Sequence, residues 1–326
     1  MNLSIPTIRI GGRYRIQLRN AEGKVTKETD WFDNLVTNTG LDWYGACTAD
    51  KIQQFAGYAP WGRCAVGTSN TPPTNTDTTL NAQIAVQPDY SNFAMQPSGS
   101  TTYVSGPPAY LTTTNTYTFT LGAVVGNIAE IGVGCFPSAG PTPTSATNLT
   151  LFSHALIQSG GSPTTISVTA ADQLIVTFEL RYYINTTDTP YSVIIAGVTY
   201  SGNMRSCVAN LGSSYLLANQ VDASTPTGNN TFCTVYNGTI GTITSIPSGT
   251  SSSIGQSSLP SYTAGTYTKS YTFNASTSTG NLSGGITAIG FACCLQGWQF
   301  SVSPAIPKDN TKIMSLSFSV SWARYP

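Results

Sequence analysis

The chain has 326 residues, with 14 Lys and Arg side chains against 14 Asp and Glu, and only 9% of its residues are charged, compared with about 25% in an ordinary soluble domain. The hydrophobic fraction of 40% and the aromatic fraction of 10% exclude an intrinsically disordered chain, and the balanced charge argues against a nucleic-acid coat, which requires a basic surface. Because a single hydrophobic core rarely extends beyond about 250–300 residues, the length predicts two domains.

The first predicted element is a β-hairpin close to the N-terminus. Residues 13–19 alternate between arginines and apolar or aromatic side chains, which is the period of a β-strand. Residues 20–24 supply a short turn with a glycine, and residues 25–31 return as the second strand. The sequence therefore predicts a two-stranded ribbon with its arginines on one face.

Basic side chains crowd this first segment. They could dock on an acidic partner, or they could be solvated charges that protect a strand edge from wrong pairing. Asp42–Ala46, a few residues further on, is the best candidate in the chain for a short helix. The candidate anchoring and interface residues are Arg13, Tyr14, Arg15, Arg19, Trp31, Phe32, Asn34 and Leu35.

From residue 61 onward the pattern is one of strands and turns. A short strand at residues 64–68 is followed by a loop rich in Pro and Thr. Regular strands punctuated by Gly, Pro, Asn and Ser favour a sandwich or a barrel over an α/β fold. The longer strands are expected at residues 110–121, 127–136, 151–157, 165–168 and 174–184.

Four sequence blocks occur twice in the same order, which indicates two copies of one β-domain. The paired blocks are 116–119 with 270–273, 131–135 with 289–293, 151–153 with 299–301, and 174–182 with 314–322. The predicted fold class is all-β, with two related, jelly-roll-like β-sandwich domains behind the N-terminal hairpin. The expected units are 1–45 (hairpin and anchoring segment), 46–187 (first sandwich) and 188–326 (second sandwich).

The search for catalytic chemistry favours a protein that is not an enzyme. His154 is the only histidine and alternates as a strand residue, so we interpret it as structural. The acidic residues are well scattered, although a pair that meets in space could still serve glycan cleavage. The sequence contains no cluster typical of a metal site and no nucleotide-binding motif, and we expect no cofactor.

The cysteines and the hydropathy indicate the cellular compartment in which the protein is assembled. There are seven cysteines, an odd number without a CxxC motif, and most lie in apolar strand-like runs. We expect buried free thiols in a protein assembled in a reducing compartment. The N-terminus lacks the apolar stretch of a signal peptide, and no apolar run is long enough for a membrane span.

A second kind of surface is suggested by tyrosines in loop-like surroundings of the second half. Exposed aromatic rings beside hydroxyl and amide groups could contact a glycan, or the same rings could simply cover the faces of a sheet. The candidate glycan contacts are Tyr200, Tyr215, Tyr236, Tyr262 and Tyr267.

Three stretches within roughly the first 185 residues resemble structural proteins of tailed-bacteriophage particles. Residues 12–41 resemble an N-terminal pattern of hairpin, tryptophan, Asn-Leu-Val-Thr and Gly-Leu; residues 66–80 and 130–174 are similar to the blocks that follow it. In that family an arginine often stands where this chain has His154. The order of the motifs, rather than any single motif, carries the resemblance.

The resemblance implies a virion component of the tail, neck or fibre-attachment region, assembled in the host cytoplasm. We expect an oligomer that contacts other virion proteins and copies of itself, with neither nucleic-acid binding nor membrane insertion. The alternatives are a host-surface glycan-binding tail protein, a capsid decoration protein, and an enzyme such as a depolymerase. The sequence does not separate the structural virion role from the glycan-binding and capsid decoration alternatives.

Overall fold

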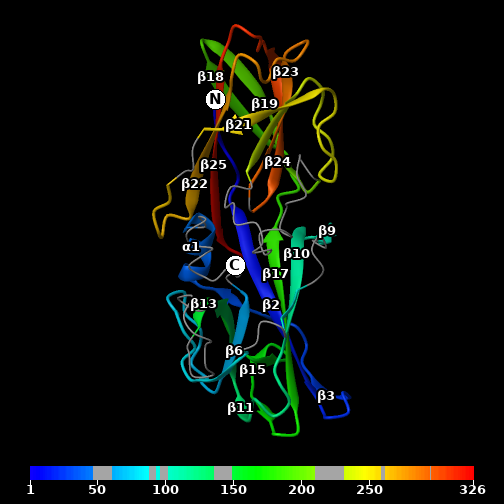
Figure 1. Ribbon diagram of the computed structural model, residues 1–326, viewed down its shortest axis with the longest axis vertical. Coiled ribbons are helices and arrows are strands. Elements are labelled where there is room, and N and C mark those ends of the chain that lie inside the picture. Colours follow the sequence, from blue (N-terminus) through cyan, green and yellow to red (C-terminus); the bar gives the residue numbers. More distant parts are fainter. Residues whose placement is uncertain are drawn as a thin grey trace.

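The structure is a computed structural model that describes residues 1–46, 61–87, 93–95, 102–135, 149–209, 231–257, 261–293 and 295–326. The molecule is elongated, with two β-rich lobes stacked along its long axis (Figure 1). Within the described residues, α1 (Asn38–Ala46) is the one α-helix. The prediction of an all-β fold is therefore confirmed, and the short helix lies where the sequence indicated, with its start four residues earlier.

The lower lobe consists of two sheets that face each other. Its first sheet contains β2 (Ile8–Arg19), β17 (Gln173–Tyr183), β10 (Tyr110–Thr118) and β8 (Phe93–Met95), with β3 (Val25–Glu28), β4 (Phe32–Asp33) and β9 (Thr102–Val104) beside them. Its second sheet has the order β5 (Leu35–Val36), β13 (Thr150–Leu156), β12 (Glu130–Cys135), β6 (Arg63–Gly67) and β7 (Gln83–Val86). Two short ladders complete the lobe, β11 (Gly126–Ile128) with β16 (Ile166–Val168) and β14 (Gln158–Ser159) with β15 (Ser162–Pro163).

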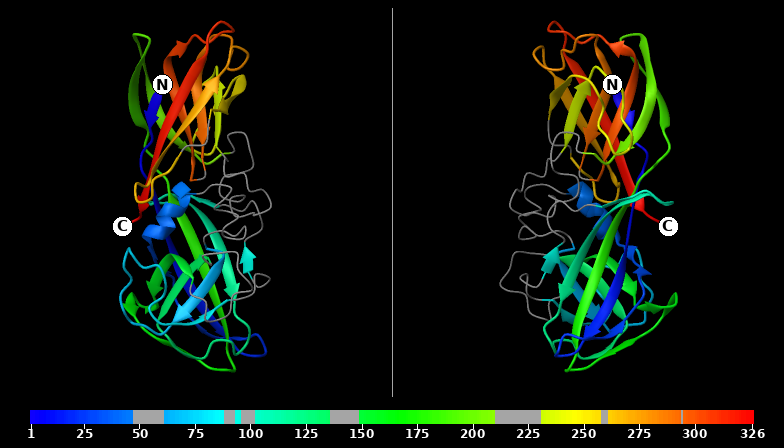
Figure 2. Two further views of the ribbon diagram at one scale, coloured as in Figure 1. Left: turned by 60° about the vertical axis from the view of Figure 1, so that its left-hand side comes forward. Right: turned by 90° about the vertical axis from the view of Figure 1, so that its right-hand side faces the viewer.

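The upper lobe is a curled sheet that follows β17 in the chain. Its strands, in the order in which they pair, are β18 (Thr189–Ile195), β19 (Val198–Cys207), β24 (Gly297–Ile306), β23 (Ile286–Ala292), β20 (Phe232–Tyr236), β21 (Ser251–Gln256), β22 (Thr268–Ala275), β25 (Met314–Arg324) and β1 (Asn2–Ser4). Figure 2 shows the two lobes from two further sides, with β1 and the C-terminal strands sharing the upper one.

The first strands of the chain belong to both lobes. β1 pairs in parallel with β25 in the upper lobe, and β2 then runs into the lower lobe. β2 pairs with β17 along nearly its whole length, from Arg9 opposite Tyr183 to Arg19 opposite Gln173, and its first residues also pair in parallel with the end of β25. The expected separate unit 1–45 therefore has no counterpart in the strand pairing, because β2 is an inner strand of the first sheet.

Aromatic side chains fill the core of both lobes. In the lower lobe the fully buried Tyr14 packs against Phe178, and its hydroxyl reaches the opposite sheet, where it lies 2.6 Å from the Ser153 hydroxyl and accepts a hydrogen bond from the backbone N–H of Val133. In the upper lobe Phe291 stacks on Phe318 with ring centroids 4.2 Å apart. Burial of rings of this size supplies much of the hydrophobic stabilisation of each lobe.

Helix α1 lies between the lobes and is bonded to both. Its N-cap is the buried Thr37, whose hydroxyl accepts from the N–H of Gly40 and donates to the carbonyl of Leu151. On the upper-lobe side, Trp322 donates to the carbonyl of Leu41 at 2.8 Å. Three more contacts from the upper lobe are Tyr262 to Asp42 at 2.6 Å, Lys269 to the Gly45 carbonyl at 3.0 Å, and Arg324 to Asn38.

The strand order of the two lobes corresponds. The run β13-β12-β6-β7 has the same order and antiparallel pairing as β24-β23-β20-β21, and β10-β17 corresponds to β22-β25. The register of the closing pair differs by two residues, since Tyr117 faces Val176 whereas Tyr271 faces Phe318, two places beyond the matching Leu316. This correspondence is what a duplicated domain would show, and the chain passes from β17 to β18 between residues 183 and 189.

The packing of α1 against β13 can be tested at Gly40, where an added Cβ would collide with the carbonyl oxygen of Phe152. Alanine in a helix is normally favoured over glycine by about 1 kcal/mol, but here we expect Gly40→Ala to destabilise the fold by about 1–3 kcal/mol through overpacking. Urea denaturation measures the change. Gly106→Ala, where the added methyl meets open space, is the matched control; equal stability of both variants would contradict this packing.

Candidate functional site

The outer surface of the first lower-lobe sheet collects most of the predicted interface residues. Side chains at alternate positions of β2 point away from the core, and their partners on β17 and β4 point the same way. The result is a surface that we call the arginine face. It is defined by Arg9, Arg13, Arg15, Arg19, Arg181 and Trp31.

Carboxylates and rings hold several of these guanidinium groups in place. Arg13 forms two parallel bonds to the carboxylate of Glu179, each 3.2 Å long, and Arg181 donates to the same carboxylate at 2.5 Å. Arg13 and Arg15 also lie over the ring of Trp31, at 4.5 and 5.1 Å from its centroid. Bidentate Arg–carboxylate pairs and cation–π contacts both restrict the guanidinium plane, so this part of the face is pre-organised.

The structure separates the predicted interface residues into two groups. Arg13, Arg15, Arg19 and Trp31 share the arginine face and are partly exposed. The other predicted contacts do not lie on it. Those four are Tyr14, Phe32, Asn34 and Leu35.

Tyr14 and Phe32 lie in the core of the lower lobe, with 0% and 5% of their surface exposed. Leu35 pairs with His154 in the second sheet, and Asn34 bonds through its backbone to Gly12. The burial of Tyr14 and Phe32 corrects their assignment to the interface, and the segment 32–41 packs mostly within the chain's own fold. Because its apolar residues are needed to close the chain's own sandwich and to start α1, few of them remain on the surface.

The tyrosines proposed for glycan contact do not form an exposed patch among the described residues. Tyr200 and Tyr236 are buried in the upper-lobe core, with 6% and 4% exposed. Tyr262 stacks on Trp322 and donates to Asp42 as part of the α1 contacts, and Tyr267 is partly buried against the core. Tyr215 lies outside the described residues. For these four described tyrosines the structure favours the alternative role of covering the sheet.

His154 lies at the centre of a buried ionic cluster that the sequence did not reveal. Its ring nitrogens lie 2.7 Å from a carboxylate oxygen of Asp77 and 3.0 Å from one of Glu130, and the imidazole is fully buried. Glu130 also accepts from the backbone N–H groups of Asn81 and Ala82, while Asp77 accepts from Thr74. The cluster therefore ties the loop between β6 and β7 to the sheet formed by β12 and β13.

The hydrogen-bond pattern assigns a positive charge to His154, because both ring nitrogens face carboxylates and each must then donate. Burial alone lowers the pKa of His154, but the bonds to Glu130 and Asp77 outweigh it and the pKa is raised. For Glu130 and Asp77 burial likewise acts in the opposite direction, and the donors around them leave both carboxyl pKa values lowered.

The cluster is suited to holding structure rather than to catalysis. The imidazole has no exposed surface, and both of its nitrogens are hydrogen-bonded to carboxylates, so it is not accessible to a substrate. Within the described part of the chain, no group of three or more His, Cys, Asp or Glu side chains could hold a metal ion.

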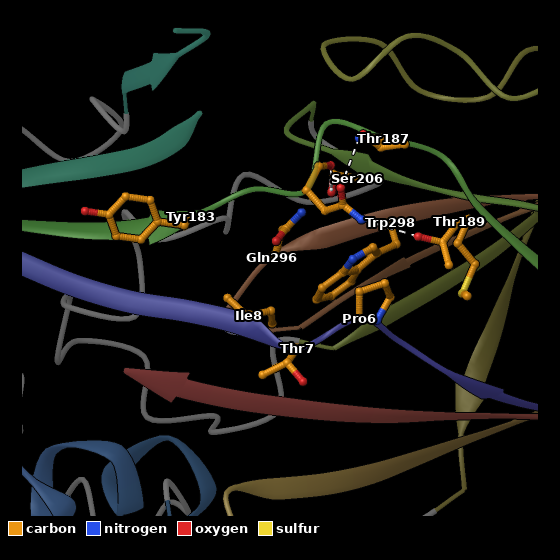
Figure 3. Close-up of a pocket in the computed structure, with 11 residues that line it drawn as sticks. Pro6, Thr7, Ile8, Tyr183, Thr187, Thr189, Ser206, Gln296 and Trp298 are labelled. Atoms are coloured by element: carbon orange, nitrogen blue, oxygen red, sulfur yellow. Dashed lines mark hydrogen bonds between the residues drawn. The ribbon is translucent and has the colours of Figure 1, made fainter. Parts of the chain in front are cut away.

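A small pocket opens at the junction of the lobes (Figure 3). It has an empty volume of about 290 Å³, part of it open to solvent, and lies between the β1–β2 and β17–β18 connections. Ser206 donates to the carbonyl of Asn185 beside it, and Gln296 lines it with an amide nitrogen that lacks a partner among the described residues. Among the described residues, no Asp, Glu, Lys, Arg or His lines the pocket, so these walls supply hydrogen-bonding groups but no carboxylate, amine or imidazole for acid–base chemistry.

Comparison of the chain with family models, with curated proteins and with solved structures found no match. In the part of the chain that the structure describes, no helix has the length and apolar character needed to cross a bilayer.

Removal of the central cation of the buried cluster should strongly destabilise the lower lobe. His154→Gln leaves two carboxylates facing each other without a full positive charge, and we expect a loss of about 3–5 kcal/mol in the free energy of unfolding. The double variant with Asp77→Asn should lose less than the sum of the two single changes, because the groups are coupled. Additive losses measured by urea denaturation would contradict the cluster.

The stability supplied by this cluster should depend on pH in both directions. The lowered pKa values of Asp77 and Glu130 give stability that is present above their unfolded values, about 4, and is lost as pH falls through the folded values. The raised pKa of His154 gives stability that is complete below about 6.5 and is lost as pH rises through the folded value.

The difference in unfolding free energy between wild type and His154→Gln should therefore be largest between about pH 5 and 6.5. Denaturation curves recorded from pH 3 to 9 measure it. Asp30→Asn, a change at an exposed carboxylate of the hairpin, is the control and should give a small difference across this range. A difference between wild type and His154→Gln that does not vary with pH would exclude the charged form of His154.

Proposed function

We propose that this chain is a structural component of a tailed-bacteriophage virion, a tail or tail-fibre appendage protein that assembles as an oligomer and attaches through its N-terminal segment. The observation that carries the proposal is the arginine face, a concentrated set of cations on one exposed sheet surface of a chain with very few charges. An uneven distribution of this kind directs association with a partner of opposite charge.

The build of the molecule is compatible with a rigid connector. β2 pairs with strands of both lobes, and α1 is hydrogen-bonded to both lobes, so a partner bound to β2 would also hold the upper lobe in place. Attachment would use the outer surface of β2 rather than a free tail, because the inner side chains of the same strand form the core. The proposed partners are other virion proteins and copies of the same chain.

The buried thiols support assembly in the reducing host cytoplasm. Cys64, Cys135, Cys207, Cys233 and Cys293 are all free and buried. Burial raises the pKa of the Cys207 thiol to about 11 and that of Cys135 to about 12, which keeps both protonated and unreactive at neutral pH.

Antibody raised against the purified chain and coupled to gold should label particles of the phage whose genome encodes it at the tail or neck. Electron microscopy of intact, purified particles gives the position, and particles of an unrelated phage are the control. Label spread over the capsid would replace the proposal by the capsid decoration alternative. Particles without label, although the protein is detected in the infected cell, would overturn the structural role.

A further inference from the structure

We propose that the arginine face binds an extended acidic segment of a second, different virion protein, with the carboxylates of that segment lying along β2. This inference rests on the proposed function and adds to it the chemistry of the partner. The face is formed by β2 with β17 and β4, and its arginines outnumber the facing carboxylates, which are Glu28, Asp33 and Glu179.

The arginines at the two ends of β2, Arg9 and Arg19, remain available to bind a partner. Arg9 and Arg19 have no ion pair within the described residues: Arg9 donates to the carbonyl of Arg324 at 3.2 Å, and Arg19 donates to the amide oxygen of Gln17 at 3.3 Å. Arg13 and Arg15, in contrast, already pair with Glu179 and Glu28. A partner would thus gain most from carboxylates that reach both ends of the strand.

The geometry of the row favours an extended peptide. Alternate residues of a strand lie about 6.6–6.8 Å apart on one face, and Arg13, Arg15 and Arg19 occupy such positions. An extended segment with acidic residues at every second position has the same repeat, so its carboxylates can face successive guanidinium groups. The ten residue steps from Arg9 to Arg19 correspond to roughly 33 Å, the length of an extended peptide of about eleven residues.

The side chains in the middle of the arginine face are already held in fixed orientations. Glu179 and the Trp31 ring fix the guanidinium planes of Arg13 and Arg15, and Arg181 lies 4.3 Å from the centroid of the Tyr110 ring. Tyr183 and Tyr325 stack with centroids 3.5 Å apart. Pre-organised cations and rings lose less side-chain entropy on binding than free lysines would.

The test uses the full-length protein and two fluorescein-labelled peptides of equal composition, one alternating Glu and Thr and one with the Glu residues in a single block. Fluorescence anisotropy at low ionic strength measures binding. We expect the alternating peptide to bind more tightly, and the affinity to fall as salt is added. The variant Arg9→Glu with Arg19→Glu should bind about tenfold or more weakly, because like charges then face each other.

The matched control is Lys27→Glu with Lys312→Glu, which makes the same change in net charge away from the arginine face. Lys27 stands opposite the inward-facing Leu18, and Lys312 lies in the upper lobe beside Asp309. The control should bind the alternating peptide within about twofold of wild type, because binding depends on position rather than on total charge. Circular dichroism confirms that both variants are folded.

Several outcomes would overturn the inference. These are failure of the wild type to bind the alternating peptide, equal binding of both peptides, and equal loss in the control. Tighter binding of dextran sulfate than of either peptide would identify an anionic glycan as the ligand instead. Self-association of the wild type that Arg9→Glu with Arg19→Glu abolishes, seen by analytical ultracentrifugation, would identify a second copy of the chain.

Incorporation into particles separates the inference from the proposed function. If the Arg9→Glu, Arg19→Glu chain loses peptide binding but enters particles normally, the inference fails while the structural role stands. If the wild-type chain binds the peptide but is absent from particles, the proposed function fails and the acidic-segment chemistry still holds for the isolated protein.

Discussion

β2 lies between β17 and β25, and the two lobes are joined through this pairing. The strand makes its full ladder with β17 in the lower lobe and begins beside the end of β25, the closing strand of the upper lobe. One face of β2 places Tyr14 in the core, where its hydroxyl bonds to the opposite sheet, and the other face carries the arginines. A change in the register of β2 by one residue would exchange these two sets of side chains, so the core and the arginine face depend on the same pairing.

Several of the chain's few charged side chains form internal bonds. His154 is held between two carboxylates, and the buried Lys308 donates to the carbonyls of Ser276 and Asp309 and to the side chain of Asn281, at 2.6 to 2.9 Å. Lys269, also buried, reaches the last turn of α1. A buried cation is tolerated only when its donors are satisfied, and each of these sites fastens a loop or a helix to a strand. Arg9 and Arg19, in contrast, lie at the ends of the arginine face rather than in a buried site.

Much of the fold followed from local patterns in the sequence. The alternation in residues 13–19 identified both the strand and the side chains that face outward, and the glycine-containing turn gave the hairpin with β3. The repeated blocks anticipated the matching strand orders of the two lobes. Periodicity of two residues is a property of any single strand, and it can therefore be read without knowledge of the partner strand.

The candidate site was only partly predictable. Arg13, Arg15, Arg19 and Trp31 lie on one face, whereas Tyr14 and Phe32, which were also expected at the interface, are buried in the core. Which face of a strand is covered depends on the opposite sheet, and the local sequence does not contain that information. The His154 cluster joins Asp77, Glu130 and His154, residues that lie far apart in the chain. No spacing rule connects them, because the pairing of β12 with β13 and the return of the β6–β7 loop bring them together.

The sequence by itself determined the all-β class, the position of the hairpin and of the short helix, and the concentration of arginines near the N-terminus. These features depend on composition and on neighbours within a few residues. Only the tertiary structure decided that the N-terminal strand is an inner strand of the first sheet, that α1 connects the lobes, and that the lone histidine is a buried cation. Each of these depends on contacts between residues distant in the chain, whose free energy appears only when the sheets pack together.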